Sequence, residues 1–234
     1  MKRPGIFITL DGIDGSGKST HLRLLAAHLR RRGYQVTTTR EPGGTRAGEA
    51  IRKVLLGRSA IPLAPRAELA LMYAARAQHI EEVLRPALAR GEVILSDRYN
   101  DASLAYQGWG RGLGAATVRA FDHLVCGRLQ PNLTLILDLD PRASLRRVRG
   151  RRSGRSRFEA AGLKFLRRVR AGYRAIARRD PRRAILVRAD RPVGQVQSEI
   201  RRQVDKFLGQ RSTRNVSGQK RQSSRPVIPP LGAF

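Results

Sequence analysis

The chain has 234 residues, 41% of them apolar, which suffices for one folded domain with a substantial core. Its only cysteine, Cys126, excludes a disulfide framework and a thiolate metal site, and without a long apolar run we expect a cytoplasmic protein with neither membrane span nor signal peptide. The formal net charge of +29, nearly all from arginine, leaves nucleic-acid binding, phosphate handling or a bias of composition open.

A phosphate-binding loop is the first motif along the chain. The apolar run at 6–10 predicts a buried strand, and residues 12–20 fit the pattern G-x-x-x-x-G-K-[ST]. In residues 18–29, apolar and polar side chains alternate at helical spacing. The loop therefore ends at a helix N-terminus, whose unpaired N–H groups favour an anion. A glycine-rich turn without a ligand is the alternative, but the flanking strand and helix are the context that the motif requires. The predicted ATP-binding residues are Gly12, Ile13, Asp14, Gly15, Ser16, Gly17, Lys18, Ser19 and Thr20.

The next segments continue the alternation of strands and helices. Residues 36–39 predict a second strand, followed by a turn at 40–45 and a helix at 48–56. Glu49 and Arg52 are three residues apart on that helix. An ordinary surface ion pair is therefore an alternative to a functional role for Arg52.

A long helix is predicted at 66–90, where apolar residues form a nearly continuous face. Arg76 lies within this helix. Because an isolated buried charge is costly, we expect a carboxylate or a ligand opposite Arg76.

Three further strands are predicted at 92–96, 133–138 and 184–187. Strands that alternate with helices predict an α/β fold, with a five-stranded parallel sheet and helices on both faces. Ligands bind at the carboxyl ends of strands in such sheets. Asp97 and Arg98 should therefore lie near the phosphate-binding loop.

The C-terminal part of the chain is rich in arginine. Residues 146–157 lack apolar periodicity, which favours a mobile cationic loop, either a solvated charge run or a lid that neutralises phosphate charge. Helices are predicted at 159–177 and 194–208. Residues 209–234 contain five basic and no acidic residues, and we interpret them as a disordered basic tail. The predicted domain therefore spans residues 1–208.

Four motifs together resemble those of the thymidylate kinase family, over about residues 6–208. They are Gly-Ile-Asp-Gly-Ser-Gly-Lys-Ser-Thr at 12–20, Arg-Glu-Pro-Gly-Gly-Thr at 40–45, Asp-Arg-Tyr at 97–99 with Ala-Tyr-Gln-Gly at 105–108, and the arginine-rich loop before Arg157-Phe158-Glu159. The first motif is shared by many nucleotide-binding proteins, whereas the second and third together are specific. Within the family, the chain resembles the bacterial type, which has an arginine-rich lid. This resemblance implies a P-loop nucleoside monophosphate kinase fold. It also implies a homodimeric enzyme that phosphorylates dTMP to dTDP with ATP and Mg²⁺, for dTTP synthesis.

The resemblance implies roles for individual residues. Asp14 would meet the acceptor's 3′-hydroxyl, and Tyr106 would cover the deoxyribose where a 2′-hydroxyl would need room. Arg98 and Arg52 would grip the acceptor phosphate, and Arg76 would donate to a thymine carbonyl. The implied catalytic residues are Lys18, Asp14 and Arg98 with the lid arginines Arg149, Arg151, Arg152 and Arg155; those for dTMP are Glu41, Pro42, Arg52, Met72, Arg76, Arg98, Ser103, Tyr106 and Gln107; those for Mg²⁺ are Ser19 and Asp97.

Several positions depart from the family's usual pattern. Met72 replaces the aromatic that stacks on thymine, Ala102 replaces the first serine of a pair, and Ala75 replaces an aspartate. Asp11 stands where a glutamate is common, and Ser156 where an aspartate usually precedes the lid arginine. The residues that handle phosphate are all present, so these departures bear mainly on the base site.

Two other functions are compatible with the sequence. One is a kinase of another nucleotide or nucleoside, and the other is a nucleic-acid-binding P-loop protein whose positive charge is its function. Because the arginines are spread along many segments without interleaved aromatics, we favour the enzyme and expect at most non-specific contact with nucleic acid.

Overall fold

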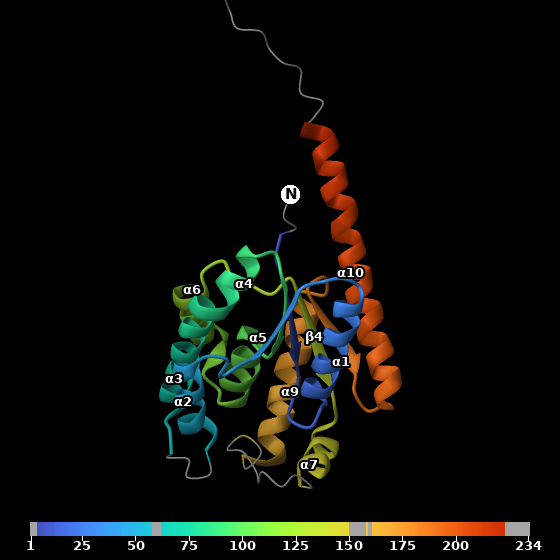
Figure 1. Cartoon of the computed structure of the whole chain (residues 1–234). Coiled ribbons are helices and arrows are strands. Elements are labelled where there is room, and N and C mark those ends of the chain that lie inside the picture. The colour runs from blue at the N-terminus through green and yellow to red at the C-terminus, as the bar shows by residue number, and fades with distance from the viewer. Residues whose placement is uncertain (1–3, 58–61, 150–157, 159–160, 223–234) are drawn as a thin grey trace, which may run out of the picture.

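The computed structural model describes residues 4–57, 62–149, 158 and 161–222, and the structural statements below concern these residues. A five-stranded parallel sheet lies at the centre, with helices around it (Figure 1). The strands are β1 (Ile6–Asp11), β2 (Val36–Arg40), β3 (Val93–Asp97), β4 (Leu133–Asp138) and β5 (Ala184–Arg188), in the spatial order β2-β3-β1-β4-β5. The predicted α/β class and the five parallel strands are confirmed.

The strand order explains where ligands can bind. β1 lies between β3 and β4. The crossover from β1 runs to β2 on one side of the sheet, whereas the crossover from β3 runs past β1 to β4 on the other side. Leu10 of β1 is paired with Asp97 of β3, which brings the carboxyl ends of the two strands side by side. In open parallel sheets this switch point is the usual ligand crevice. The loop after β1 and the residues after β3 therefore share one edge of the sheet.

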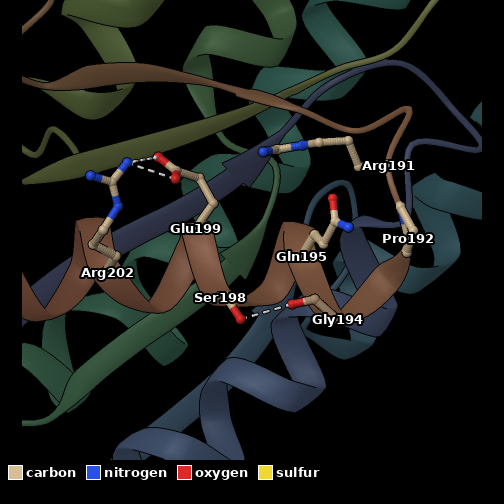
Figure 2. A pocket seen from close by; sticks show the side chains of 7 residues that line it. All are labelled: Arg191, Pro192, Gly194, Gln195, Ser198, Glu199 and Arg202. Atoms are coloured by element: carbon tan, nitrogen blue, oxygen red, sulfur yellow. Dashed lines mark hydrogen bonds and ion pairs between the residues drawn. The ribbon is translucent and has the colours of Figure 1, made fainter.

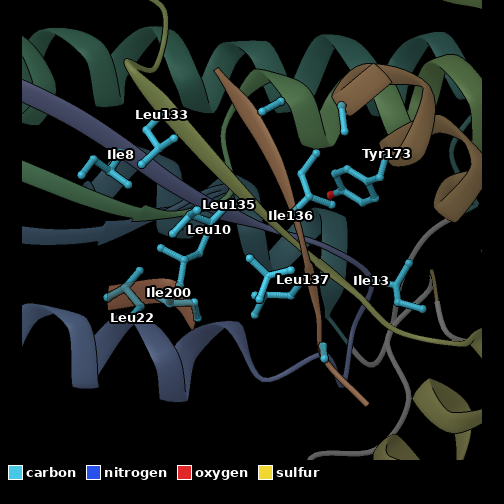
Figure 3. Close-up of a cluster of buried hydrophobic side chains, with 14 of the residues drawn as sticks. Ile8, Leu10, Ile13, Leu22, Leu133, Leu135, Ile136, Leu137, Tyr173 and Ile200 are labelled. Atoms are coloured by element: carbon cyan, nitrogen blue, oxygen red, sulfur yellow. The ribbon is translucent and has the colours of Figure 1, made fainter. Parts of the chain in front are cut away.

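Helices cover both faces of the sheet, as predicted. Figure 3 shows Leu22 and Ile200 on one side of the strands and Tyr173 on the other, all of them buried in one hydrophobic cluster. α1 and α10 pack against each other on the first side. The helices are α1 (Lys18–Arg31), α2 (Arg46–Leu56), α3 (Pro65–His79), α4 (Arg85–Ala89), α5 (Asn100–Ser103), α6 (Gly114–Cys126), α7 (Pro141–Arg149), α9 (Gly162–Arg179) and α10 (Val193–Gln222).

The helix predicted at 66–90 is not one regular α-helix. α3 passes into a π-helical segment, η1 (Ile80–Leu84), before α4 begins. Pro86, in the first turn of α4, has no N–H to donate, which disfavours a continuous α-helical ladder at this point. A second π-helical segment, η2 (Leu104–Gly110), lies between α5 and α6, in a region to which the sequence assigned no helix.

Two predicted boundaries near the C-terminus were wrong. Residues 146–149 of the predicted lid belong to α7, because Val148 is a buried apolar anchor within the arginines. α10 does not stop at the buried Leu208 but continues to Gln222. The predicted tail therefore begins inside a helix. Residues 223–234 lie outside the described residues, and their disorder stays a prediction.

Candidate active site

The phosphate-binding loop joins β1 to α1, as predicted. Gly12 has φ 131°, and a Cβ there would lie 2.5 Å from the carbonyl oxygen of Leu137, so both conformation and space require glycine. Gly17 is the left-handed N-cap of α1, with φ 94°. The loop thus leads directly into the unpaired N–H groups at the start of α1, an arrangement that binds phosphate.

Lys18 and Asp14 bring opposite charges into this loop. Nζ of Lys18 lies 3.9 Å from Oδ1 of Asp14 and donates to the carbonyl oxygen of Ile13 at 3.2 Å. Burial, and then the charge of Arg98, lower the pKa of the Lys18 ammonium, while nearby carboxylates oppose that shift. The anionic phosphates of a nucleotide would therefore stabilise the charged form of Lys18.

Ser19 and Asp97 meet where α1 begins and β3 ends. Oγ of Ser19 donates to Oδ2 of Asp97 at 2.7 Å. Hydroxyl and carboxylate oxygens are ligands that Mg²⁺ prefers, and P-loop enzymes hold Mg²⁺ with the same two residue types. The two residues predicted to bind the metal are thus adjacent, and their donor atoms fit it.

Arg98 is fixed beside the loop by its backbone and by its side chain. Its φ of 77° is the only left-handed value among the described non-glycine residues, a strain that persists only where the surroundings hold it. Nη2 donates to Oδ1 of Asp14 at 2.7 Å and to the Tyr106 hydroxyl at 3.0 Å. Nη1 donates to the Tyr173 hydroxyl at 3.1 Å. The predicted proximity of Arg98 to the loop is therefore observed.

A pocket of about 230 Å³ gathers most of these groups. Four cationic side chains and three carboxylates line it, which makes it suited to phosphate and metal rather than to an apolar ligand. Arg40 was not predicted, although it opens the motif at 40–45. The lining residues are Asp14, Gly15, Gly17, Lys18, Ser19, Thr20, Arg40, Glu41, Arg52, Asp97 and Arg98.

Arg76, on α3, is buried opposite a carboxylate, one of the two alternatives that the sequence left open. Nε donates to Oε2 of Glu41 at 2.7 Å, and Nη2 donates to the Tyr99 carbonyl oxygen and the Ser103 hydroxyl, each at 3.0 Å. Burial would raise the pKa of the Glu41 carboxyl, but Arg76 and His79 hold it below its ordinary value. Within the described part of the chain, the buried Nη1 of Arg76 has no hydrogen-bond partner. One donor of this guanidinium therefore remains for a ligand.

Tyr106 and Gln107, both in η2, already bond within the protein. The Tyr106 hydroxyl accepts from Arg98, and its ring meets that of Phe158 edge-on at 5.0 Å between centroids. Nε2 of Gln107 donates to Oε1 of the buried Glu68 at 2.9 Å. Glu68 was not predicted. It accepts a hydrogen bond from the amide nitrogen of Gln107, which from the sequence was expected to face the base.

Met72 lies one turn before Arg76 on α3 and packs, partly buried, against the hydrophobic core. Like Ser103 and Gln107, it is not among the residues that line the pocket of 230 Å³. The structure thus brings most of the predicted phosphate-binding residues together in one pocket, although Gly12, Ile13 and Ser16 do not line it. The residues predicted to bind the base lie outside it. Of these, Ser103 is linked to the pocket by its bond with Arg76, which in turn donates to Glu41 at the pocket wall.

Arg52 does not form the surface pair with Glu49. Glu49 instead accepts from Arg40, at 3.0 and 3.1 Å, and from the Gly44 amide at 3.1 Å. Nη1 of Arg52 donates to the Pro42 carbonyl oxygen at 2.7 Å. Arg52 is therefore held at the wall of the pocket by backbone rather than by a competing carboxylate.

Three of the predicted lid arginines, Arg151, Arg152 and Arg155, lie outside the described residues, and for Arg149 only the backbone, at the end of α7, is described. Which of them is catalytic stays a prediction. Arg147, which was not predicted, donates to the Gly15 carbonyl oxygen at 3.2 Å. This bond ties α7 to the phosphate-binding loop.

Asp11 is the most unusual carboxyl near the site. It is completely buried, its Oδ1 accepts from the Tyr173 hydroxyl at 3.1 Å, and its Oδ2 has no hydrogen-bond partner within the described residues. Burial raises the pKa of Asp11 from 3.8 to about 7; Asp101 adds to the rise and Arg98 opposes it. From the sequence, Asp11 stood out only because a glutamate is common at this position in the family. Its partner Tyr173 could not be distinguished from an ordinary core residue of the predicted helix.

The stability of the protein should depend on pH through Asp11. Because its pKa is higher in the folded than in the unfolded chain, the folded state binds this proton more tightly, and the resulting stabilisation is lost as pH rises from about 4 to about 7. Asp11→Asn removes that loss. We expect the free energy of unfolding of Asp11→Asn, relative to the parent, to be roughly 2–3 kcal/mol higher at pH 8 than at pH 5. Denaturant unfolding at both pH values measures this, and a difference independent of pH would contradict it.

A second hollow, of about 570 Å³, lies at the start of α10 and contains none of the predicted site residues. Figure 2 shows Arg202 paired with Glu199, and the Ser198 hydroxyl donating to the Gly194 carbonyl oxygen. These polar groups bond to one another. The pocket at the phosphate-binding loop is therefore the candidate active site.

None of the described helices is both long and apolar enough to cross a membrane.

Comparison with known proteins gives one consistent result. The family model described as thymidylate kinase matches residues 10–200. The thymidylate kinase of Teredinibacter turnerae is 47% identical over 204 residues, which cover 87% of this chain and 99% of that protein. The thymidylate kinase of Deinococcus radiodurans is 49% identical over 196 residues, covering 84% and 94%. The crystal structure of thymidylate kinase from Ehrlichia chaffeensis superposes with a TM-score of 0.71 at 31% identity, covering 86% of this chain and 99% of that one.

Proposed function

The chain belongs to the thymidylate kinase family, and from this premise we propose how its residues transfer the γ-phosphoryl group of ATP to dTMP. The products are ADP and dTDP, the precursor of dTTP. The observation that carries the assignment of residues is the pocket in which Lys18, the Ser19–Asp97 pair and Arg98 converge. Phosphoryl transfer needs little covalent chemistry from the protein, so positioning and charge stabilisation are what such a pocket must supply.

The phosphate-binding loop and Lys18 hold the ATP phosphates. N–H groups at the start of α1 donate to phosphate oxygens, and Lys18 stabilises the charge that develops on the transferred group. Ser19 and Asp97 would hold Mg²⁺, which, when bound, neutralises charge on the β- and γ-phosphates. Their bond of 2.7 Å supports this role, because it places both oxygens at the same corner of the pocket.

Arg98 and Arg52 grip the phosphate of dTMP. Both line the pocket, and a guanidinium can donate two parallel hydrogen bonds to a phosphate. Asp14 faces Arg98 at 2.7 Å and lies beside Lys18, so it sits between donor and acceptor phosphates, where it can orient the acceptor's 3′-hydroxyl. One lid arginine completes the neutralisation of charge. Glu41 lines the pocket wall, and the Pro42 carbonyl oxygen holds Arg52 there.

The thymine base binds along α3 and η2. Nη1 of Arg76 has no hydrogen-bond partner among the described residues, which supports its donation to a thymine carbonyl. Ser103 and Gln107 would lie at the base edge, and Tyr106 against the deoxyribose. The proposal also includes a homodimer and a cytoplasmic location. Both rest on the resemblance to the family alone.

A panel of nucleoside monophosphates tests the proposal. Each is incubated with ATP and Mg²⁺, and ADP formation is followed. We expect dTMP to give the highest kcat/KM, and omission of Mg²⁺ to abolish turnover. A higher kcat/KM for another nucleotide would favour the rival kinase, and salt-dependent DNA binding without kinase activity would favour the nucleic-acid-binding protein.

Met72 offers a test of the base site. A thioether against a ring contributes roughly 0.3–1.5 kcal/mol, so methionine can replace an aromatic platform at reduced strength. We expect Met72→Ala to raise KM for dTMP several-fold and Met72→Phe to lower it, with kcat little changed because ground and transition states share the contact. Steady-state kinetics with dTMP measure this. A folded Met72→Ala enzyme with the parent's KM would show that another side chain forms the platform.

A further inference from the structure

We infer that Asp11 and Tyr173 form a positioning pair that sets the orientation of the Arg98 guanidinium toward the acceptor phosphate. The inference rests on the proposed role of Arg98 in binding dTMP. The three residues come from different parts of the fold: Asp11 ends β1, Arg98 follows β3, and Tyr173 lies on α9. The sequence assigned no role to Asp11 or to Tyr173.

The Tyr173 hydroxyl lies between a cation and a carboxyl group, at 3.1 Å from Nη1 of Arg98 and 3.1 Å from Oδ1 of Asp11. A hydroxyl has a single proton, and a guanidinium can only donate. The proton of Tyr173 must therefore point to Asp11, and an oxygen lone pair must face Arg98. Asp11 thus fixes the hydroxyl, and the hydroxyl fixes one arm of Arg98.

Burial strengthens this chain of hydrogen bonds. Asp11 is 0% and Tyr173 2% exposed, so bulk water does not compete for their polar atoms. Figure 3 shows the Tyr173 ring among buried apolar side chains, reaching from its helix toward the strands. Oδ2 of Asp11 is buried and has no hydrogen-bond partner in the part of the chain that the structure describes. Such an oxygen is costly, and an apolar residue would avoid that cost. The position therefore serves more than packing.

The bond to Tyr173 differs from the other bonds of Arg98 in its relation to the pocket. Asp14 and Arg98 both line the pocket, where substrate groups compete for them, whereas Tyr173 does not. When the acceptor binds, the Arg98–Asp14 bond must be shared with it. The bond from Nη1 to Tyr173 is kept, and it holds the guanidinium plane while Nη2 exchanges partners.

Tyr173→Phe is the sharpest test, because it keeps the ring and removes only the hydroxyl. We expect kcat/KM for dTMP to fall roughly tenfold, with KM for ATP changed less than twofold, since the loop and Lys18 are untouched. Asp11→Ala should have the same effect. Asp11→Asn, whose amide oxygen can still accept from Tyr173, should recover kcat/KM to within about twofold of the parent.

Tyr99→Phe is the matched control. Tyr99 directly follows Arg98 in sequence, but its hydroxyl donates to the Leu129 carbonyl oxygen at 3.3 Å and not to Arg98. It should lower the melting temperature about as much as Tyr173→Phe and leave the kinetics unchanged. Equal kinetics for Tyr173→Phe and the parent would overturn the inference, as would a parallel loss toward ATP and dTMP. A parent enzyme inactive on dTMP would instead overturn the proposed function and the inference with it.

Discussion

Lys18→Ala is expected to lower kcat/KM by at least about 10³-fold while the protein stays folded. The ammonium lies in a water-poor loop, 7% exposed, where a positive charge acts more strongly on a developing negative charge than it would in water. Among the described residues, Nζ of Lys18 donates to the Ile13 carbonyl oxygen and faces the Asp14 carboxylate. Both are polar contacts, so the loss of Lys18 should leave the apolar core intact. Steady-state kinetics with ATP and dTMP, together with thermal unfolding, measure both effects.

Lys53→Ala is the control for charge. Lys53 is exposed on α2, outside the pocket, and its removal should change kcat/KM less than twofold. Near-normal turnover by a folded Lys18→Ala enzyme would overturn the assignment of the loop. An unfolded Lys18→Ala protein would contradict the expectation that Lys18 acts on substrate rather than on stability.

Arg98→Lys is expected to lower kcat/KM for dTMP on the order of 10²-fold, although the positive charge is kept. The guanidinium uses both terminal nitrogens, toward Asp14 and Tyr106 on one arm and toward Tyr173 on the other. A lysine ammonium is a single point donor that cannot bridge these groups and grip a phosphate at two oxygens. The expected loss is in the use of dTMP, and KM for ATP should change little.

Arg66→Lys, at an exposed position of α3, is the matched control and should behave as the parent. Isothermal titration with dTMP alone separates binding from chemistry: Arg98→Lys should weaken dTMP binding, and ATP binding should be retained. If Arg98→Lys bound and used dTMP normally, another cation of the pocket, such as Arg52 or Arg40, would have to hold the acceptor phosphate.

The parts of the molecule that sequence predicted are those set by local rules. β1 is an apolar run followed by glycines at fixed spacing, and that pattern alone specifies a strand, a turn and a helix N-terminus. Asp97 and Arg98 could be placed near the loop because parallel strands bring their carboxyl ends together.

The contacts of the base site could not be predicted, because they join residues far apart in sequence. Arg76 reaches Glu41 across 35 positions, and Gln107 reaches Glu68 across 39. Their partners depend on how α3 and η2 pack, which no local pattern encodes. The sequence required an acceptor for Arg76 but did not indicate which residue supplies it.

The helical segment between β3 and β4 was not predicted from the sequence. Two of its residues, Gly108 and Gly110, are glycines, and both lie in η2. A Cβ on Gly110 would lie 2.6 Å from the Phe165 ring, and one on Gly172 of α9 would lie 2.8 Å from the Trp109 ring. These glycines allow two helices to approach closely, and their role becomes visible only once α9 is placed against η2.

The bond between Glu68 and Gln107 has a consequence for which pyrimidines the enzyme can accept. Both oxygens of Glu68 accept hydrogen bonds from Arg111, and a guanidinium can only donate. The Gln107 amide therefore cannot turn over without setting its carbonyl oxygen against Oε1 of Glu68, which is itself an acceptor. The end of the amide turned away from Glu68 is therefore an acceptor in every bound state. In the proposed base site, where Gln107 meets the base edge, this acceptor would complement the N3–H of a thymine or uracil ring. Cytosine would present a lone pair at N3 instead, and two acceptors repel.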